Sequence, residues 1–132
     1  MFNLNTQFGL LGTGFVCDII RHQDYWRCDI SVIHQVDAPK QRPDEIMLHC
    51  RIEDKALLQL FALLEGDLHL GHVIVLQFVA EYLNFDSAHF DQEKSYQNHL
   101  LHFNVRLAMV EACLINGELF DFDKMRVIKK AA

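Results

Sequence analysis

The sequence predicts a mainly β fold, a five-stranded Greek-key barrel with one helix, and three observations support it. Five stretches are expected to be strands, and four of them show the two-residue alternation of apolar and polar side chains that is typical of burial on one face. A single stretch has helical spacing of its apolar residues, and it lies between the third and the fourth strand. The chain has 132 residues, 51% of them hydrophobic, which is enough for one core and too few for two domains. Elements in this order are typical of the OB-fold, whose strand face and loops bind oligonucleotides or oligosaccharides.

The expected strands alternate with turn signals along the chain. They cover residues 15–22, 25–34, 46–53, 73–85 and 101–115. Ahead of the first strand, Gly9, Gly12 and Gly14 stand in FGLLGTGF, a spacing that does not match the dinucleotide-binding pattern GxGxxG. We therefore interpret these glycines as positions where a long first strand bulges or coils sharply. We expect one domain over residues 1–120 and a basic, solvated tail over residues 121–132.

The second and third strands are expected to share an outer face. On the core side the alternation places Trp26, Cys28, Ile30 and Val32 of the second strand and Ile46, Leu48, Cys50 and Ile52 of the third. The opposite face then carries Tyr25, Arg27, His49 and Arg51. The direction of Trp26 depends on a regular strand start, because a bulge there would turn the ring outward.

The helix is predicted from its cap and from its apolar stripe. Asp54 is expected to be the N-cap of KALLQLFALLEG, and the helix is expected to end at Gly66. The stripe consists of Leu57, Leu60, Phe61 and Leu64. This amphipathic helix should close the bottom of the barrel.

The fourth strand, VIVLQFVAEYLNF, is almost continuously apolar. Such a strand is typical of burial on both faces, or of an edge that another subunit covers. We therefore expect the protein to be a homo-oligomer.

Two long connections carry basic and aromatic side chains. The first, VDAPKQRPDE, contains both prolines of the chain and is expected to be a hairpin tip that presents Lys40 and Arg42. The second, DSAHFDQEKSYQNH, follows Phe85 and presents Phe90, Lys94 and Tyr96. Loops of this length are usually functional or disordered.

Charge and cysteine content limit the classes of function. The formal net charge of −6 argues against general attraction of polyanions, so any nucleic-acid site must be a local basic patch. The four cysteines lie in apolar strand patterns without a CxxC pair, which predicts buried thiols in a reducing compartment. No signal peptide and no apolar stretch of about 18 residues is present, so we expect a cytoplasmic protein that does not enter a membrane.

Signatures of metal binding and of catalysis are weak. The pairs His69 with His72 and His99 with His102 lack a further ligand at zinc spacing, so no metal and no cofactor is expected. No activated-nucleophile motif is present, and Asp18 and other acids are interpreted as surface residues. We expect a protein that is not an enzyme; an enzyme with a small-molecule pocket in the barrel mouth is a third alternative.

Single-stranded nucleic acid is bound by flat side chains that stack on bases and by cations that follow the phosphates. The residues that offer this chemistry are Tyr25, Trp26, Arg27, Lys40, Arg42, His49, Arg51, Phe85, Phe90, Lys94 and Tyr96. The alternative hypothesis is an OB-fold scaffold subunit whose long hairpins contact protein partners and which binds no nucleic acid.

Four segments resemble the bacterial single-stranded DNA-binding protein family: WRCDISVI, EIMLHCRIEDKALLQLFALLEGD, HVIVLQFVAEYLNF and HFNVRLAMVEACLINGE. The opening FNLNTQFGLLGTGF is similar to that of small OB-fold proteins carried by integrating conjugative elements and plasmids. The resemblance spans roughly residues 2–117 and implies a non-catalytic accessory protein that binds single-stranded DNA. The chain ends in MRVIKKAA, where that family has a Gly/Pro/Gln-rich tail with an acidic end, so recruitment of partners by the tail is not implied.

Overall fold

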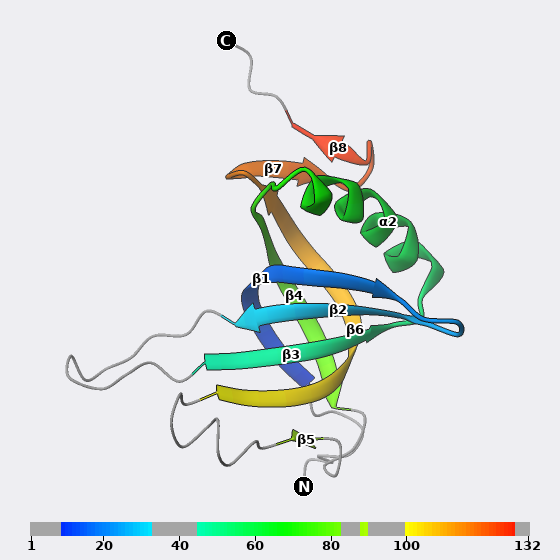
Figure 1. Cartoon of the computed structure of the whole chain (residues 1–132). Helices are drawn as coiled ribbons and strands as arrows, with labels where there is room; N and C mark the ends of the chain where they lie inside the picture. The colour runs from blue at the N-terminus through cyan, green and yellow to red at the C-terminus, as the bar shows by residue number, and fades with distance from the viewer. Residues whose placement is uncertain (1–8, 33–44, 83–87, 90–99, 129–132) are drawn as a thin grey trace, which may run out of the picture.

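The computed structural model describes residues 9–32, 45–82, 88–89 and 100–128, which form one curved sheet and one helix (Figure 1). The barrel elements are β1 (Gly9–Arg21), β2 (Trp26–Val32), β3 (Glu45–Ile52), α2 (Lys55–His69), β4 (Ile74–Tyr82) and β6 (Leu100–Ile115). Three short strands are added: β5 (Ala88–His89), β7 (Glu118–Asp121) and β8 (Arg126–Val127).

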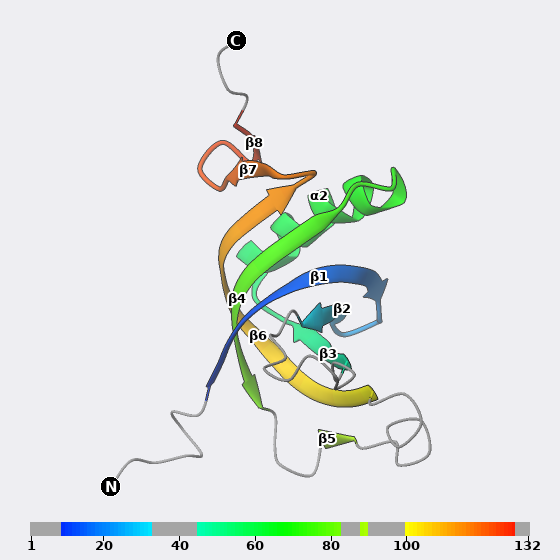
Figure 2. The ribbon, with the colours of Figure 1, turned by 90° about the vertical axis from the view of Figure 1, so that its left-hand side faces the viewer.

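The sheet closes on itself through the two ends of its strand order. The order β3-β2-β1-β4-β6 is completed by parallel pairing of β3 with β6, while the other neighbours in the barrel are antiparallel. The first half of β1 pairs with β4 and its second half with β2, so one long strand belongs to both sides of the barrel (Figure 2). The predicted five-stranded Greek-key barrel, with its helix between the third and fourth strands, is confirmed.

The interior is filled as the strand alternation predicts. Cys28, Ile30, Leu48, Cys50 and Ile52 are fully buried, and Trp26, Val32 and Ile46 pack against them. The helix lies across one end of the barrel (Figures 1 and 2). Its predicted stripe is buried there, and the Asp54 carboxylate accepts hydrogen bonds from two backbone N–H groups of the first turn.

The predicted end of the helix at Gly66 is wrong, because the helix continues for three further residues to His69. Leu68 still packs against the core, so the apolar stripe extends beyond the glycine. The chain leaves the helix at Gly71, whose φ of +82° lies in the left-handed region that glycine adopts easily.

The fourth strand is buried on one face only. Ile74, Leu76, Phe78 and Ala80 are buried, whereas Gln77 between them is exposed. Both edges of β4 pair with strands of the same chain, β1 and β6. The expectation of burial on both faces is therefore wrong within one chain, and the outward apolar side chains of this strand remain at the surface.

The segment after the barrel is folded as far as Ile128. Asn116 and Gly117, with φ of 52° and 81°, make the predicted turn, and β7 returns along β6. Phe120 is buried and Val127 packs against the core. We expected residues 121–132 to be a solvated tail; the first eight instead belong to the β7–β8 hairpin, and residues 129–132 lie outside the described part.

Close contacts explain two glycines of the opening strand. A Cβ on Gly14 would lie 2.4 Å from Ile30 Cγ2 and 2.6 Å from the backbone oxygen of Ser31. A Cβ on Gly12 would lie 2.8 Å from the ring of Phe78. These glycines therefore let β1 pack closely against both of its neighbours, whereas the bulge of this strand lies between Val16 and Asp18.

We predict that Gly14→Ala destabilises the protein by about 1–3 kcal/mol, because the added methyl group meets backbone that cannot move aside. The matched control is Gly66→Ala. This glycine is exposed in the last turn of α2 with no atom within 4 Å of an added Cβ, so the substitution should stabilise the helix by up to about 0.5–1 kcal/mol. Urea unfolding of both variants measures the two effects, and equal effects would contradict the proposed role of Gly14.

Three of the four cysteines have the burial that we expected, and Cys17 does not. The register of β1 against β2 shifts between Val16 and Asp18, and this bulge turns the Cys17 side chain outward. Burial raises the pKa of the Cys113 thiol to about 12 and raises the pKa values of the Cys28 and Cys50 thiols further. The buried thiols therefore remain protonated at neutral pH.

A maleimide at pH 7.5 should label one thiol of the folded protein and four in urea, since only thiolates that reagents can reach react quickly. Mass spectrometry counts the adducts. The variant Cys17→Ser should take up none while folded; rapid labelling of that variant would show that the barrel opens on the labelling timescale.

Candidate nucleic-acid interface

The outer face of β2, β3 and β6 carries a concentration of polar side chains, and we call it the polar face. It consists of Arg27 and Asp29 from β2, His49 and Arg51 from β3, His102 and Arg106 from β6, and Tyr25 just before β2. The core residues of the same strands point the opposite way, because successive side chains of a strand alternate. The polar face is therefore the outward half of the pattern that builds the barrel.

Three arginines form a row across this face. Arg27 is the register partner of Arg51 in the β2–β3 pair, and Arg51 is the partner of Arg106 in the β3–β6 pair. Neighbouring strands lie about 4.8 Å apart, so the row spans roughly 10 Å across the sheet. The row crosses the line at which the barrel closes.

Each arginine of the row has a carboxylate beside it. The shortest pairs are Arg27 Nε with Asp29 Oδ1 at 3.1 Å, Arg51 Nε with Glu53 Oε1 at 2.7 Å, and Arg106 Nη2 with Glu81 Oε2 at 2.5 Å. The first two nitrogens are buried and lie outside hydrogen-bond geometry despite the short distances, so these contacts are ion pairs. All three side chains remain partly exposed, which leaves guanidinium nitrogens at the surface.

Tyr25 stands at the end of the row nearest the β1–β2 turn. The Arg51 guanidinium carbon lies 4.0 Å from the centre of its ring, and the His22 ring stacks on it at a centroid distance of 4.8 Å. The ring is half-buried and held in place. A guanidinium group over the ring and an imidazole stacked on it thus form one packed cluster.

Trp26 lies on the core side of the sheet, in the phase that its strand predicts. Its ring packs against the core, and the Arg21 guanidinium carbon lies 4.2 Å from the ring centre. Arg21 is held there by two hydrogen bonds that it donates to Glu65 of the helix, at 3.2 Å and 2.6 Å. Trp26 therefore joins the barrel to α2 and does not belong to the polar face.

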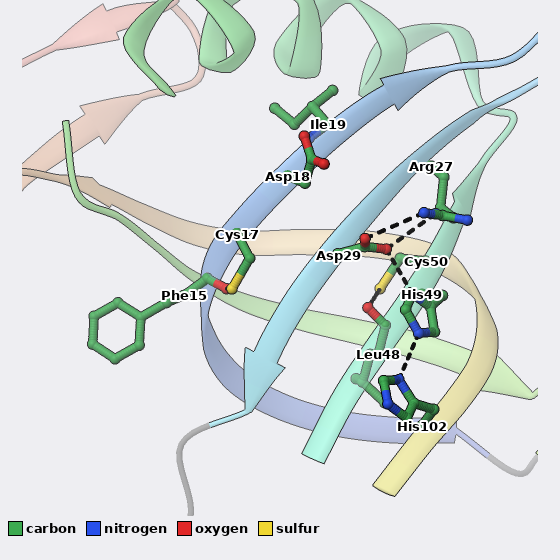
Figure 3. A network of polar contacts seen from close by, with 10 residues as sticks. All are labelled: Phe15, Cys17, Asp18, Ile19, Arg27, Asp29, Leu48, His49, Cys50 and His102. Carbon is green, nitrogen blue, oxygen red and sulfur yellow. Dashed lines mark hydrogen bonds and ion pairs between the residues drawn. The ribbon is translucent and has the colours of Figure 1, made fainter. Parts of the chain in front are cut away.

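Asp29, His49 and His102 form a hydrogen-bonded chain across three strands (Figure 3). His49 Nδ1 lies 2.7 Å from Asp29 Oδ1, and His49 Nε2 lies 2.9 Å from His102 Nδ1. The two imidazole planes are 4° apart with centroids 5.1 Å apart. Parallel planes cannot be further apart than the shortest distance between their atoms, here 2.9 Å, so the rings meet edge to edge through a hydrogen bond instead of stacking.

The structure brings four of the predicted site residues together on the polar face: Tyr25, Arg27, His49 and Arg51. Six others lie outside the described residues: Lys40, Arg42, Phe85, Phe90, Lys94 and Tyr96. Sequence reasoning missed Arg106 and His102. The alternation of β6 places both outward, but the pairing of β6 with β3 joins segments more than 50 residues apart, which no local pattern reveals.

Other kinds of site find little support in the described part of the chain. It contains no group of three or more His, Cys, Asp or Glu side chains arranged to hold a metal ion. Asp18 and Asp29 are register partners on β1 and β2. Asp18 accepts from the Ile19 backbone N–H and Asp29 contacts Arg27 and His49, so each carboxylate has a local role.

The helix of the described region is too short to cross a membrane. No protein-family model, no curated protein and no solved structure matches the chain. The resemblance to the single-stranded DNA-binding family therefore stays a prediction.

Proposed function

We propose that this protein is a non-catalytic, OB-fold protein that binds single-stranded DNA on its polar face. The observation that carries the proposal is the row of Arg27, Arg51 and Arg106 next to the ring of Tyr25. Single strands are bound by this combination, in which a ring stacks on a base at about 1–3 kcal/mol per base and cations follow the phosphates. A duplex would hide its bases from the ring.

The charges of the polar face predict modest affinity and a salt dependence set by the few phosphates that its arginines contact. Three arginines are offset by Asp29, Glu53 and Glu81, so the row has almost no net charge before the ligand binds. The carboxylates hold the guanidinium groups in position, and a phosphate must share or displace them. The overall charge of −6 adds no long-range attraction.

We predict that the double variant Arg27→Ala with Arg51→Ala binds fluorescent oligo-dT more weakly. The slope of log K against log salt should become smaller in magnitude by about 1.4, or about 0.7 for each lost phosphate contact. The charge-matched control is Lys55→Ala with Arg126→Ala, which removes two exposed cations from α2 and β8. Fluorescence anisotropy at several salt concentrations gives the slopes, and circular dichroism checks the fold.

Equal slopes for the double variant and its control would remove the arginine row from the site. Arg106→Ala should flatten the slope by about a further 0.7. Oligo-U of the same length compares RNA with DNA, and tighter binding of oligo-U would contradict the assignment to DNA.

A second candidate function, protein interaction, is favoured by an exposed apolar surface on β1, β4, β6 and β7. We call it the apolar face, and it consists of Leu11, Phe15, Val75, Val79, Met109, Leu114 and Leu119. Leu11 is 73% exposed and Met109 is 53% exposed, although they flank Val79 in register. Contiguous apolar surface of this kind usually marks an interface.

We propose that the apolar face joins two copies of the chain. Its apolar rows, Leu11–Val79–Met109 and Phe15–Val75–Leu114, carry no charged side chain, and the exposed Glu111 in the β6 bulge between them must stay hydrated at the edge of the contact. This contact leaves the polar face open, because that face uses β2, β3 and the first half of β6.

We predict that Leu11→Glu shifts a concentration-dependent dimer to monomer, because burying a carboxylate in the contact is unfavourable. Leu70→Glu is the matched control, since Leu70 is also 73% exposed but follows α2, outside the apolar face. Multi-angle light scattering measures the masses. A wild-type monomer at every micromolar concentration would contradict self-association, and a retained contact with a different protein would then favour the scaffold hypothesis.

A further inference from the structure

The chain Asp29–His49–His102 spans the polar face and is not needed to build the barrel. Its members come from β2, β3 and β6, and all three side chains are on the outward side of these strands. The His49 imidazole lies 2.7 Å from the Asp29 carboxylate and 2.9 Å from the His102 imidazole, so the three groups form a proton path. At one end of this path the carboxylate holds a proton on His49. The other end is His102.

The hydrogen bonds determine where protons sit. An ionised carboxylate only accepts, so Asp29 requires a proton on His49 Nδ1. In the neutral chain, His49 Nε2 then accepts from His102 Nδ1, which leaves His102 Nε2 without a proton. Nε2 lies at the opposite edge of the ring from the bonded nitrogen and is the atom that meets a ligand.

Adding one proton keeps every bond of this chain. If the charge resides on His102, its Nδ1 still donates to His49; if it resides on His49, the shared proton moves along the same bond. In both forms His102 Nε2 carries a hydrogen and becomes a donor. A second proton would put hydrogens on both nitrogens of the 2.9 Å contact and break it.

We propose that His102 is a phosphate-binding residue of the polar face, and that the chain Asp29–His49–His102 makes binding of single-stranded DNA take up one proton. This inference rests on the proposed function and names the ligand group, a phosphate oxygen, that accepts from His102 Nε2. Histidine is the side chain that ordinarily changes charge between about pH 5 and pH 8, which is the interval that the test covers.

The surroundings of His102 agree with a chain that gains charge only when an anion is present. Asp29 and His49 lie in the register row next to that of Arg27 and Arg51, whereas His102 lies four residues, roughly 13 Å, along β6 from Arg106. Met47 is the register partner of His102 on β3, and His89 is its register partner on β5. The arginines beside His49 disfavour a further cation on the chain, whereas a phosphate bonded to His102 Nε2 favours it.

The test measures oligo-dT affinity between pH 8 and pH 5.5 at constant salt, because thymine does not titrate in this interval. For the wild-type chain we expect affinity to rise about tenfold for one linked proton. His102→Gln should keep the affinity seen at pH 8 within a few-fold and lose the rise in affinity at low pH. Asp29→Asn should make this rise smaller. His69→Gln is the control, since His69 is exposed on α2 and should leave the rise unchanged.

A second readout does not require DNA. Nitrogen-15 NMR of the imidazoles in the free protein should show the Nδ1–H tautomer for His102 at pH 8, which the ordinary preference for Nε2–H would not give. No oligo-dT binding at any pH overturns the proposed function and this inference with it. Binding whose pH dependence is equal in wild type and His102→Gln, or is lost in His89→Gln alone, overturns this inference only.

Discussion

Parallel pairing of β3 with β6 is the constraint on which the rest of this structure depends. The pairing joins the end strands of the sheet and turns it into a barrel whose interior apolar side chains fill. It also puts Arg51 beside Arg106 and lets His49 reach His102. Closure requires β1 to pair with both β2 and β4. This is possible because Gly14 has no side chain to collide with β2. Fold and candidate site therefore have one physical origin.

The charges of the polar face hold side chains in position and provide little long-range attraction. A chain of charge −6 cannot draw a polyanion from a distance, and each arginine of the row is already compensated by an acid. What the ion pairs provide is a fixed arrangement of donors, so less side-chain freedom is lost when a phosphate binds. The same Asp29 that compensates Arg27 also orients His49, which links the arginine row to the histidine chain.

Local patterns were enough to predict the barrel, its core and half of the polar face. Alternation within two adjacent strands places Tyr25, Arg27, His49 and Arg51 on one side, because hairpin neighbours keep their phase. Arg106 and His102 were missed since their neighbours are set by closure, a long-range event. The exposure of Cys17 was not predicted, because a bulge shifts the alternation of the strand and no residue pattern announces it. The helix end predicted at Gly66 was wrong, because a helix tolerates glycine where its apolar stripe continues, here with Leu68.

The long β6 strand separates the two surfaces of the barrel. Its first half places His102 and Arg106 outward beside β3, and its second half places Met109 and Leu114 outward beside β4. Between them, register shifts at Val79/Ala80 and Gln77/Phe78 leave Ala108 and Glu111 of β6 unpaired with β4, which bends the strand. The bends turn one continuous strand from a polar surface to an apolar one. The two proposed contacts, with DNA and with a second copy of the chain, therefore lie on different stretches of the same strand.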